Sequence, residues 1–268
     1  MEKRTLNIWG VSIASLVVLM IVTPRIPQPQ AYHDFADQRN FFGIPNTLDV
    51  VSNVPFLIAG IIGLVVCYRG NYFRLSLQGE LLAWTIFYIS MAAVGLGSGY
   101  YHLQPNDPRL VWDRVPMSVA LASVLAIFII ERVDEKKGTM SIIPLIMAGL
   151  GSILYWRIFR DVRLYILFQL LSCLAIAAMA ILLPPMYTHS IYWLWAGVFF
   201  LIGKIGELAD QQIYDLTRQV IGGHTLKHLG LAMVSVFTSI MLAKRSVALK
   251  RQSVLDSLRI SKSAVKTE

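Results

Sequence analysis

Long apolar runs separated by short polar loops extend along almost the whole chain. A helix needs about 20 apolar residues to cross a bilayer upright, so each run predicts a membrane-spanning helix, and the shorter runs are expected to shift at their ends by a few residues. The runs lack the apolar/polar alternation of outer-membrane barrel strands. The predicted fold is therefore an all-α polytopic membrane helix bundle. The eight runs are residues 7–23, 50–67, 82–102, 113–130, 141–156, 164–183, 190–206 and 226–243.

The first run has two interpretations. Lys3 and Arg4 precede an apolar stretch at 8–22, which is the pattern of a signal peptide. Residues 23–27, however, lack a small-x-small cleavage site. A retained N-terminal helix is therefore the favoured prediction, with a cleaved signal peptide as the alternative.

Composition agrees with a membrane location. The 268 residues are 56% hydrophobic and 15% charged, with a mean hydropathy of +0.59. A soluble protein carries roughly a quarter of charged residues. Cys67 and Cys173 both lie in apolar stretches and provide no disulfide framework. The composition thus predicts an integral membrane protein.

The formal net charge is +8, and much of the excess follows the last apolar run. Such a basic segment is typical of a cytoplasmic anchor near anionic lipid, and nucleic-acid binding is not expected. With eight spans, both termini then lie in the cytoplasm. Basic loops at 69–74 and 132–137 agree with this orientation, whereas the arginines at 157–163 oppose it. The basic tail residues are Lys244, Arg245, Lys250, Arg251, Arg259, Lys262 and Lys266.

Three histidines lie where ionisable side chains are costly, which by default indicates function. His102 ends the third run, and His224 and His228 open the eighth, four residues apart and therefore on one helix face. In the predicted topology all three meet at the non-cytoplasmic ends of their helices. Three imidazoles with one coordination position left open are typical of catalytic zinc, although copper, nickel and iron accept the same ligands.

Ser98 and Asp113 lie at the same level. Ser98 is one turn before His102, where its hydroxyl would reach a water molecule on the metal or a substrate carbonyl, or else bond back to the carbonyl of Val94. Asp113 has three interpretations. It would act as a helix N-cap, as a partner of Arg114, or as a base that takes a proton from water and returns it to a leaving group.

These residues resemble the alkaline ceramidase family, within the wider group of seven-helix membrane hydrolases that includes the adiponectin receptors. The similar pieces are Ser-x-x-x-His at 98–102, Asp-x-x-Pro-Met at 113–117 and His-x-x-x-His at 224–228, in the family's order. The resemblance covers about residues 32–243. It therefore implies three regions: an N-terminal helix and proline-rich linker at 1–31, a seven-helix domain at 32–243, and a flexible basic tail at 244–268.

The resemblance also implies a site and a reaction. Zinc would be held by His102, His224 and His228, with Asp113 and Ser98 close to the metal. The substrate would be a ceramide-type lipid of the bilayer, whose N-acyl amide is hydrolysed to a sphingoid base and a fatty acid.

A calcium site is implied less directly. Residues 34–39 are similar to the acidic element that binds calcium in some alkaline ceramidases, and oxygen ligands suit this hard cation. The possible ligands are Asp34, Asp37, Asn46 and Asp49. Arg39 stands where a ligand asparagine is expected, and its alternative role is to neutralise Asp34 or Asp37.

Charged residues also follow the seventh run. At helical spacing they are expected to form a solvated interfacial face, or alternatively to line the mouth of a site. These residues are Lys204, Glu207, Asp210 and Asp215.

The favoured function is a zinc-dependent intramembrane amidase, and three other classes compete with it. A non-catalytic zinc-containing receptor or scaffold would keep the site without turnover. A haem carrier is disfavoured because His224 and His228 project from the same helix side. A transporter lacks the paired broken helices that would indicate one.

Overall fold

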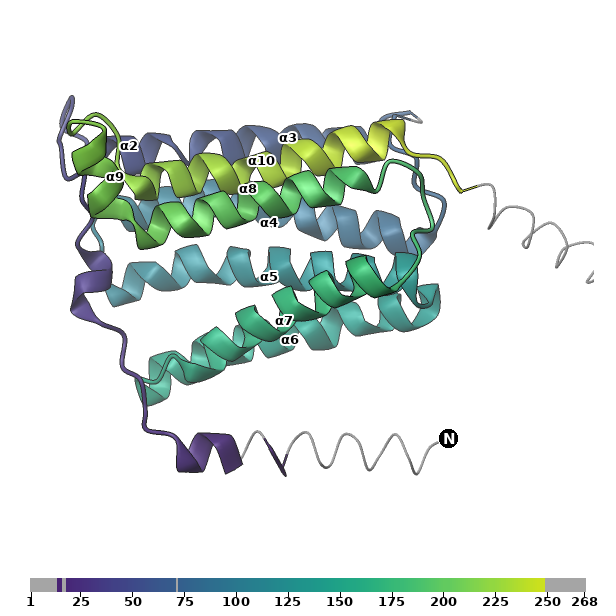
Figure 1. The fold of residues 1–268 in the computed structure, drawn as a ribbon, viewed down its shortest axis with the longest axis horizontal. Coiled ribbons are helices and arrows are strands. Elements are labelled where there is room, and N and C mark those ends of the chain that lie inside the picture. Colours follow the sequence, from purple (N-terminus) through teal and green to yellow (C-terminus); the bar gives the residue numbers. More distant parts are fainter. Residues whose placement is uncertain (1–13, 16–17, 71, 249–268) are drawn as a thin grey trace, which may run out of the picture.

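The computed structural model describes residues 14–15, 18–70 and 72–248, which form a bundle of long α-helices (Figure 1). A 3-10 turn, η1 (Gln30–His33), precedes them. The only β pairings among the described residues are two isolated bridges, so the all-α prediction is confirmed. The helices are α2 (Thr47–Val51), α3 (Val54–Tyr68), α4 (Gln78–Leu103), α5 (Asp107–Arg132), α6 (Glu135–Phe159), α7 (Arg163–Leu182), α8 (Ile191–Leu208), α9 (Asp210–Leu216) and α10 (Gly223–Lys244).

Seven membrane spans are present in this part of the chain, each long and apolar enough to cross a bilayer. They match the last seven predicted runs, with α2 and α3 together making one span, Thr47–Tyr68. Most of the first predicted run, 7–23, lies outside the described residues. The short helix α9 was not predicted, because its sequence is too polar to form an apolar run.

The start of α5 differs from the prediction. The helix begins at Asp107, and its N-cap is Asn106, whose side chain accepts a hydrogen bond from the Arg109 amide at 2.9 Å. Asp113 therefore lies inside the helix, and its interpretation as an N-cap is wrong. A carboxylate within a buried helix needs another partner.

Burial places α5 at the centre of the bundle. In its most apolar window 72% of residues are buried, against 6% in α7. It packs on α4, α6 and α7, while the exposed apolar faces of the outer helices are suited to lipid. Helices in lipid associate through close packing of small residues. At Gly97 of α4 the backbones of α4 and α5 approach so closely that an added Cβ would lie 2.1 Å from the carbonyl oxygen of Trp112 in α5.

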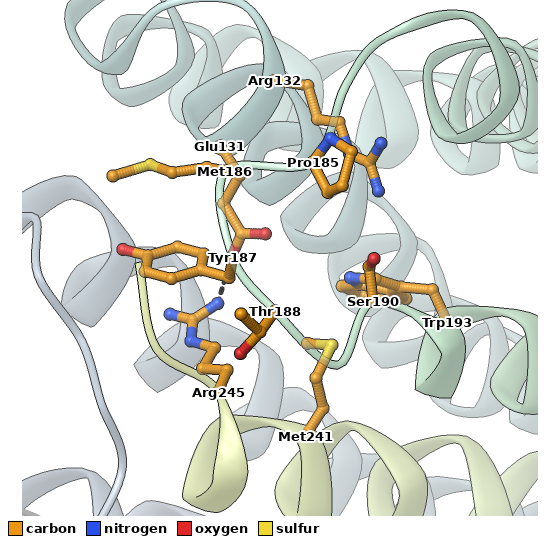
Figure 2. Close-up of a pocket in the computed structure, with 10 residues that line it drawn as sticks. All are labelled: Glu131, Arg132, Pro185, Met186, Tyr187, Thr188, Ser190, Trp193, Met241 and Arg245. Carbon is orange, nitrogen blue, oxygen red and sulfur yellow. Dashed lines mark hydrogen bonds and ion pairs between the residues drawn. The ribbon is translucent and has the colours of Figure 1, made fainter. Parts of the chain in front are cut away.

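One end of the bundle is fastened by a buried arginine just after α10. Nη1 of Arg245 donates to Glu131 of α5 at 2.6 Å, and Nη2 lies 3.3 Å from Glu80 of α4. The Tyr187 ring lies 3.8 Å from the guanidinium carbon, beside the arginine in Figure 2. Tyr187 also forms a bridge with Val247, so the first residues of the predicted flexible tail are held to the α7–α8 loop. The tail from residue 249 onward lies outside the described residues.

The opposite end is crossed by the segment that precedes α2 (Figure 1). Arg163 anchors this segment, because its guanidinium binds both Asp161 at 2.7 Å and the carbonyl of Thr23 at 2.6 Å. The hydrogen bonds from Arg163 hold the pKa of Asp161 at about 2. Further along, His33 contacts the Tyr101 hydroxyl at 2.8 Å. The segment is thereby fixed across the end of the bundle where α4 stops and α10 begins.

Candidate metal centre

His102, His224 and His228 meet in the interior at this end. His102 lies in the last turn of α4, and the other two lie in the first two turns of α10. Each offers one ligand nitrogen, and these nitrogens all lie within 4.8 Å of one another. The exposed fractions are 0%, 5% and 2%, respectively. The structure therefore brings together the three histidines that the sequence singled out.

The hydrogen bonding of His102 fits a metal site. Neither Nδ1 nor Nε2 has a hydrogen-bond partner among the described residues, although the ring is fully buried. A buried polar atom without a partner costs about 1–3 kcal/mol, so the arrangement calls for a ligand on the imidazole. A metal ion shared with His224 and His228 would meet this need.

Ser52 orients His228 from the α2–α3 junction. Its hydroxyl donates to the Asp49 carbonyl at 3.1 Å and lies 2.8 Å from Nδ1 of His228. Because the single hydroxyl proton is donated to the Asp49 carbonyl, the serine oxygen accepts a hydrogen bond from Nδ1–H of His228. This tautomer leaves Nε2 of His228 free for a metal, which is the usual task of a group behind a ligand histidine. Sequence reasoning missed Ser52, which lies far from the histidine motif.

Asp113 and Ser98 form a pair beside the triad. Both are buried, and the Ser98 hydroxyl lies near the Asp113 carboxylate. Arg114 turns away from Asp113: it donates to Gln28 at 2.6 Å, and its guanidinium carbon lies 4.3 Å from the centre of the Trp156 ring. No ion pair joins Asp113 to Arg114 in the described part of the chain, so that interpretation is wrong.

Phe35 covers the triad from the N-terminal segment. Its ring lies 4.6 Å from the His102 ring and 4.5 Å from the His224 ring, and it is 5% exposed. Asp210 holds this cover in place, since one carboxylate oxygen accepts from the Ala36 amide at 2.9 Å and the other from the His224 amide at 2.8 Å. Phe35 has no signal in the sequence, because its role depends on the path of an irregular segment. Asp210 belongs to the charged stretch after the seventh run, for which a place at the mouth of a site was the alternative prediction.

A buried ion pair adjoins the histidines. Nζ of Lys227 lies 2.8 Å from Glu207 and 3.4 Å from Nε2 of His224, and the lysine side chain is 4% exposed. Glu207 also pairs with the exposed Lys204. The charged stretch after the seventh run is thus divided: Lys204 and Asp215 are exposed as a solvated face, whereas Glu207 and Asp210 contact the site.

The four residues predicted as calcium ligands have separate contacts. Asp37 binds Arg39 through both oxygens, and these hydrogen bonds lower its pKa although burial alone would raise it. Asp49 accepts from Thr225 at 2.6 Å, Asn46 donates to the His102 carbonyl at 2.8 Å, and Asp34 is exposed. The alternative role of Arg39 as the partner of Asp37 is confirmed. The structure gives a calcium site no support.

Together, the fold and the site define an integral membrane protein whose helices bury a three-histidine cluster with the donor set of a metal centre. A family model described as Ceramidase matches residues 43–253. The chain therefore belongs to the ceramidase family, as its motifs predicted, and is an amidase that hydrolyses the N-acyl bond of ceramide. No curated protein matches the chain with significance.

Proposed function

We propose that this ceramidase is zinc-dependent and that His102, His224 and His228 hold the ion inside the membrane. The observation that carries the proposal is the buried triad, in which both ring nitrogens of His102 lack any other partner in the described structure. When bound, zinc supplies a Lewis acid and lowers the pKa of a coordinated water molecule to about 7. Imidazole nitrogens are ligands that zinc prefers.

Asp113 is proposed to move the proton. In the reaction, water adds to the amide carbonyl, the C–N bond breaks, and the products are a fatty acid and a sphingoid amine. Asp113 takes the proton that the water loses and delivers it to the leaving nitrogen, as a general base and then a general acid. Ser98, which lies near Asp113, would donate a hydrogen bond to the carboxylate and keep it oriented toward the triad.

We further propose that the site faces the non-cytoplasmic side and that the C-terminal tail is cytoplasmic. The arginines at 157–163 oppose this orientation. The basic loops at 69–74 and 132–137 and the basic segment after the last span favour it, because cytoplasmic segments carry an excess of Lys and Arg. The two-chained substrate enters sideways from the bilayer, because Phe35 and its segment cover the end of the bundle above the histidines.

The test is the substitution His224→Ala in purified protein, with zinc content and ceramide hydrolysis measured on the same sample. We expect both bound zinc and hydrolysis to be lost, because only two of the three imidazole ligands would remain. His189→Ala is the matched control, since His189 is exposed and lies in the α7–α8 loop, two residues after Tyr187, which pairs with Val247 at the opposite end. Hydrolysis by a zinc-free His224→Ala protein would refute the proposal. Zinc binding without release of fatty acid from any ceramide by the wild type would instead favour a scaffold.

A further inference from the structure

No role has yet been assigned to Lys227, although it lies between His224 and His228 in the sequence of α10. We infer that Lys227 is a catalytic residue that binds the acyl oxygen of the lipid amide, and that it also binds the carboxylate of the released fatty acid. This inference rests on the proposed function, because it assumes that the amide carbonyl meets the histidine cluster.

The first argument is position. Nζ of Lys227 is 3.4 Å from Nε2 of His224, so any oxygen atom brought to the triad lies within a few ångströms of the ammonium group. Burying a lysine is costly, and the side chain here is only 4% exposed. Lysine at a solvated interface would instead extend its ammonium group to the headgroups.

The second argument is the capacity to donate. An ammonium group has three N–H donors, and Glu207 takes one of them at 2.8 Å. The contact with His224 needs a free ring nitrogen, so it is given up when that nitrogen binds a metal. At least one N–H of the Lys227 ammonium group is then free to donate toward the histidines, and an oxygen atom of the substrate is a suitable acceptor.

The third argument is preorganisation. Glu207 is itself held, because its carboxylate accepts a hydrogen bond from the Tyr32 hydroxyl at 3.4 Å. Lys227 is therefore fixed before the substrate arrives. A fixed donor in a dry site stabilises an oxygen on which negative charge develops more than it stabilises the neutral carbonyl. The same charge will attract the carboxylate of the product.

The experiment compares Lys227→Met with Lys204→Met, since both lysines contact Glu207 but only Lys227 adjoins the histidines. Three quantities are measured: zinc content, kcat and KM on ceramide, and inhibition by two probes. One probe is palmitate, which carries the product carboxylate. The other is an N-alkyl sphingoid base, in which a methylene replaces the amide carbonyl.

For Lys227→Met we expect full zinc content, a kcat lowered about 100- to 1,000-fold, as for loss of an oxyanion donor, and a smaller change in KM. Inhibition by palmitate should weaken at least about tenfold, the effect of losing roughly 1.4 kcal/mol, while inhibition by the carbonyl-free probe stays unchanged. Lys204→Met should alter kcat less than about threefold, because its charge is screened by solvent. Lys227→Arg should recover part of the palmitate inhibition.

The inference would be overturned if Lys227→Met left both kcat and palmitate inhibition unchanged. It would also be overturned if the variant lost its zinc and was no longer inhibited by either probe, because that result indicates a structural role. Should the single variant fail to fold, Lys227→Met combined with Glu207→Gln removes the pair without leaving a buried charge, and the same result is expected. Failure of the proposed function is distinguishable, since the wild type would then lack zinc or turnover.

Discussion

The Ser52 hydroxyl favours one nitrogen of His228 as the one available to a metal. It donates a hydrogen bond to the Asp49 carbonyl and accepts one from Nδ1–H of His228, which the Asn53 amide also approaches at 3.4 Å. Without this acceptor the imidazole is free to change tautomer or rotate, and both changes compete with metal binding. Groups behind ligand histidines typically contribute 10- to 100-fold in metal affinity.

Replacing Ser52 with alanine is therefore expected to lower zinc affinity by about 10- to 100-fold, measured by competition with a chelator. Folding should be largely retained, because the serine is small. Ser90→Ala is the control, since Ser90 is equally buried but bonds only to the Ile86 carbonyl of its own helix. Equal zinc affinity in the two variants would contradict the role assigned to Ser52.

The sequence predicted the histidines but not their surroundings, and the reason is physical. His102, His224 and His228 are conspicuous because an imidazole at membrane depth is rare. Ser52 and Phe35 are ordinary residues for their segments, and only the folded path of the chain brings them to the histidines. Lys227 is as conspicuous as the histidines, because it is also an ionisable residue in an apolar helix. No role was predicted for it because it lies inside the His-x-x-x-His motif.

At the scale of elements, the contact between α4 and α5 fixes the distance between Ser98, which α4 carries, and Asp113, which α5 carries. Gly97 is next to Ser98 in α4, and its Cα faces the carbonyl of Trp112, next to Asp113 in α5. The close approach of the two backbones is thus what brings Ser98 near Asp113.

The substitution Gly97→Ala should separate these helices, because the new Cβ would lie 2.1 Å from a backbone oxygen that has no freedom to move aside. We expect a loss of about 1–3 kcal/mol in stability, seen as a lower Tm in detergent, together with reduced turnover. Gly99→Ala in the same helix meets nothing within 4 Å and should be neutral. Similar Tm values for both variants would show that the contact is not tight.

Helix identity followed from the apolar runs more reliably than helix ends did. Seven runs became seven spans, because hydrophobic length is what a bilayer selects. The first turn of α5 was missed since Asp107, Pro108 and Arg109 are polar or helix-breaking in sequence, yet proline is favoured in the first turn of a helix. That error produced the wrong N-cap interpretation of Asp113.

On the scale of the whole molecule, the two ends of the bundle have different chemistry. One end holds the histidines beneath the N-terminal segment, whose path Figure 1 shows. The other end holds Arg245 between Glu80 and Glu131, of which Figure 2 draws Glu131. The fastening at Arg245 ties α4, α5, α10 and the α7–α8 loop together. It is remote from the histidines, so its loss should affect stability without removing zinc.

Arg245→Met is expected to cost about 3–5 kcal/mol, because it leaves Glu80 and Glu131 buried without their shared cation. The measurement is a Tm in detergent, with zinc content determined on the fraction that remains folded. Lys244→Met, next to it but exposed, should change the Tm little. A stable Arg245→Met protein would mean that the two carboxyl groups need no counter-ion.

The cover formed by Phe35 also imposes an order of events during biosynthesis. The histidines are 0–5% exposed and the ring lies against two of them, so the route to them from this end of the bundle is open only while residues 34–37 are displaced. Under the proposed function, residues 34–37 would therefore settle over the histidines only after α10, which carries His224 and His228, has formed and the metal has been loaded. We expect apoprotein that has closed early to be a kinetic trap, rescued by zinc only after partial unfolding.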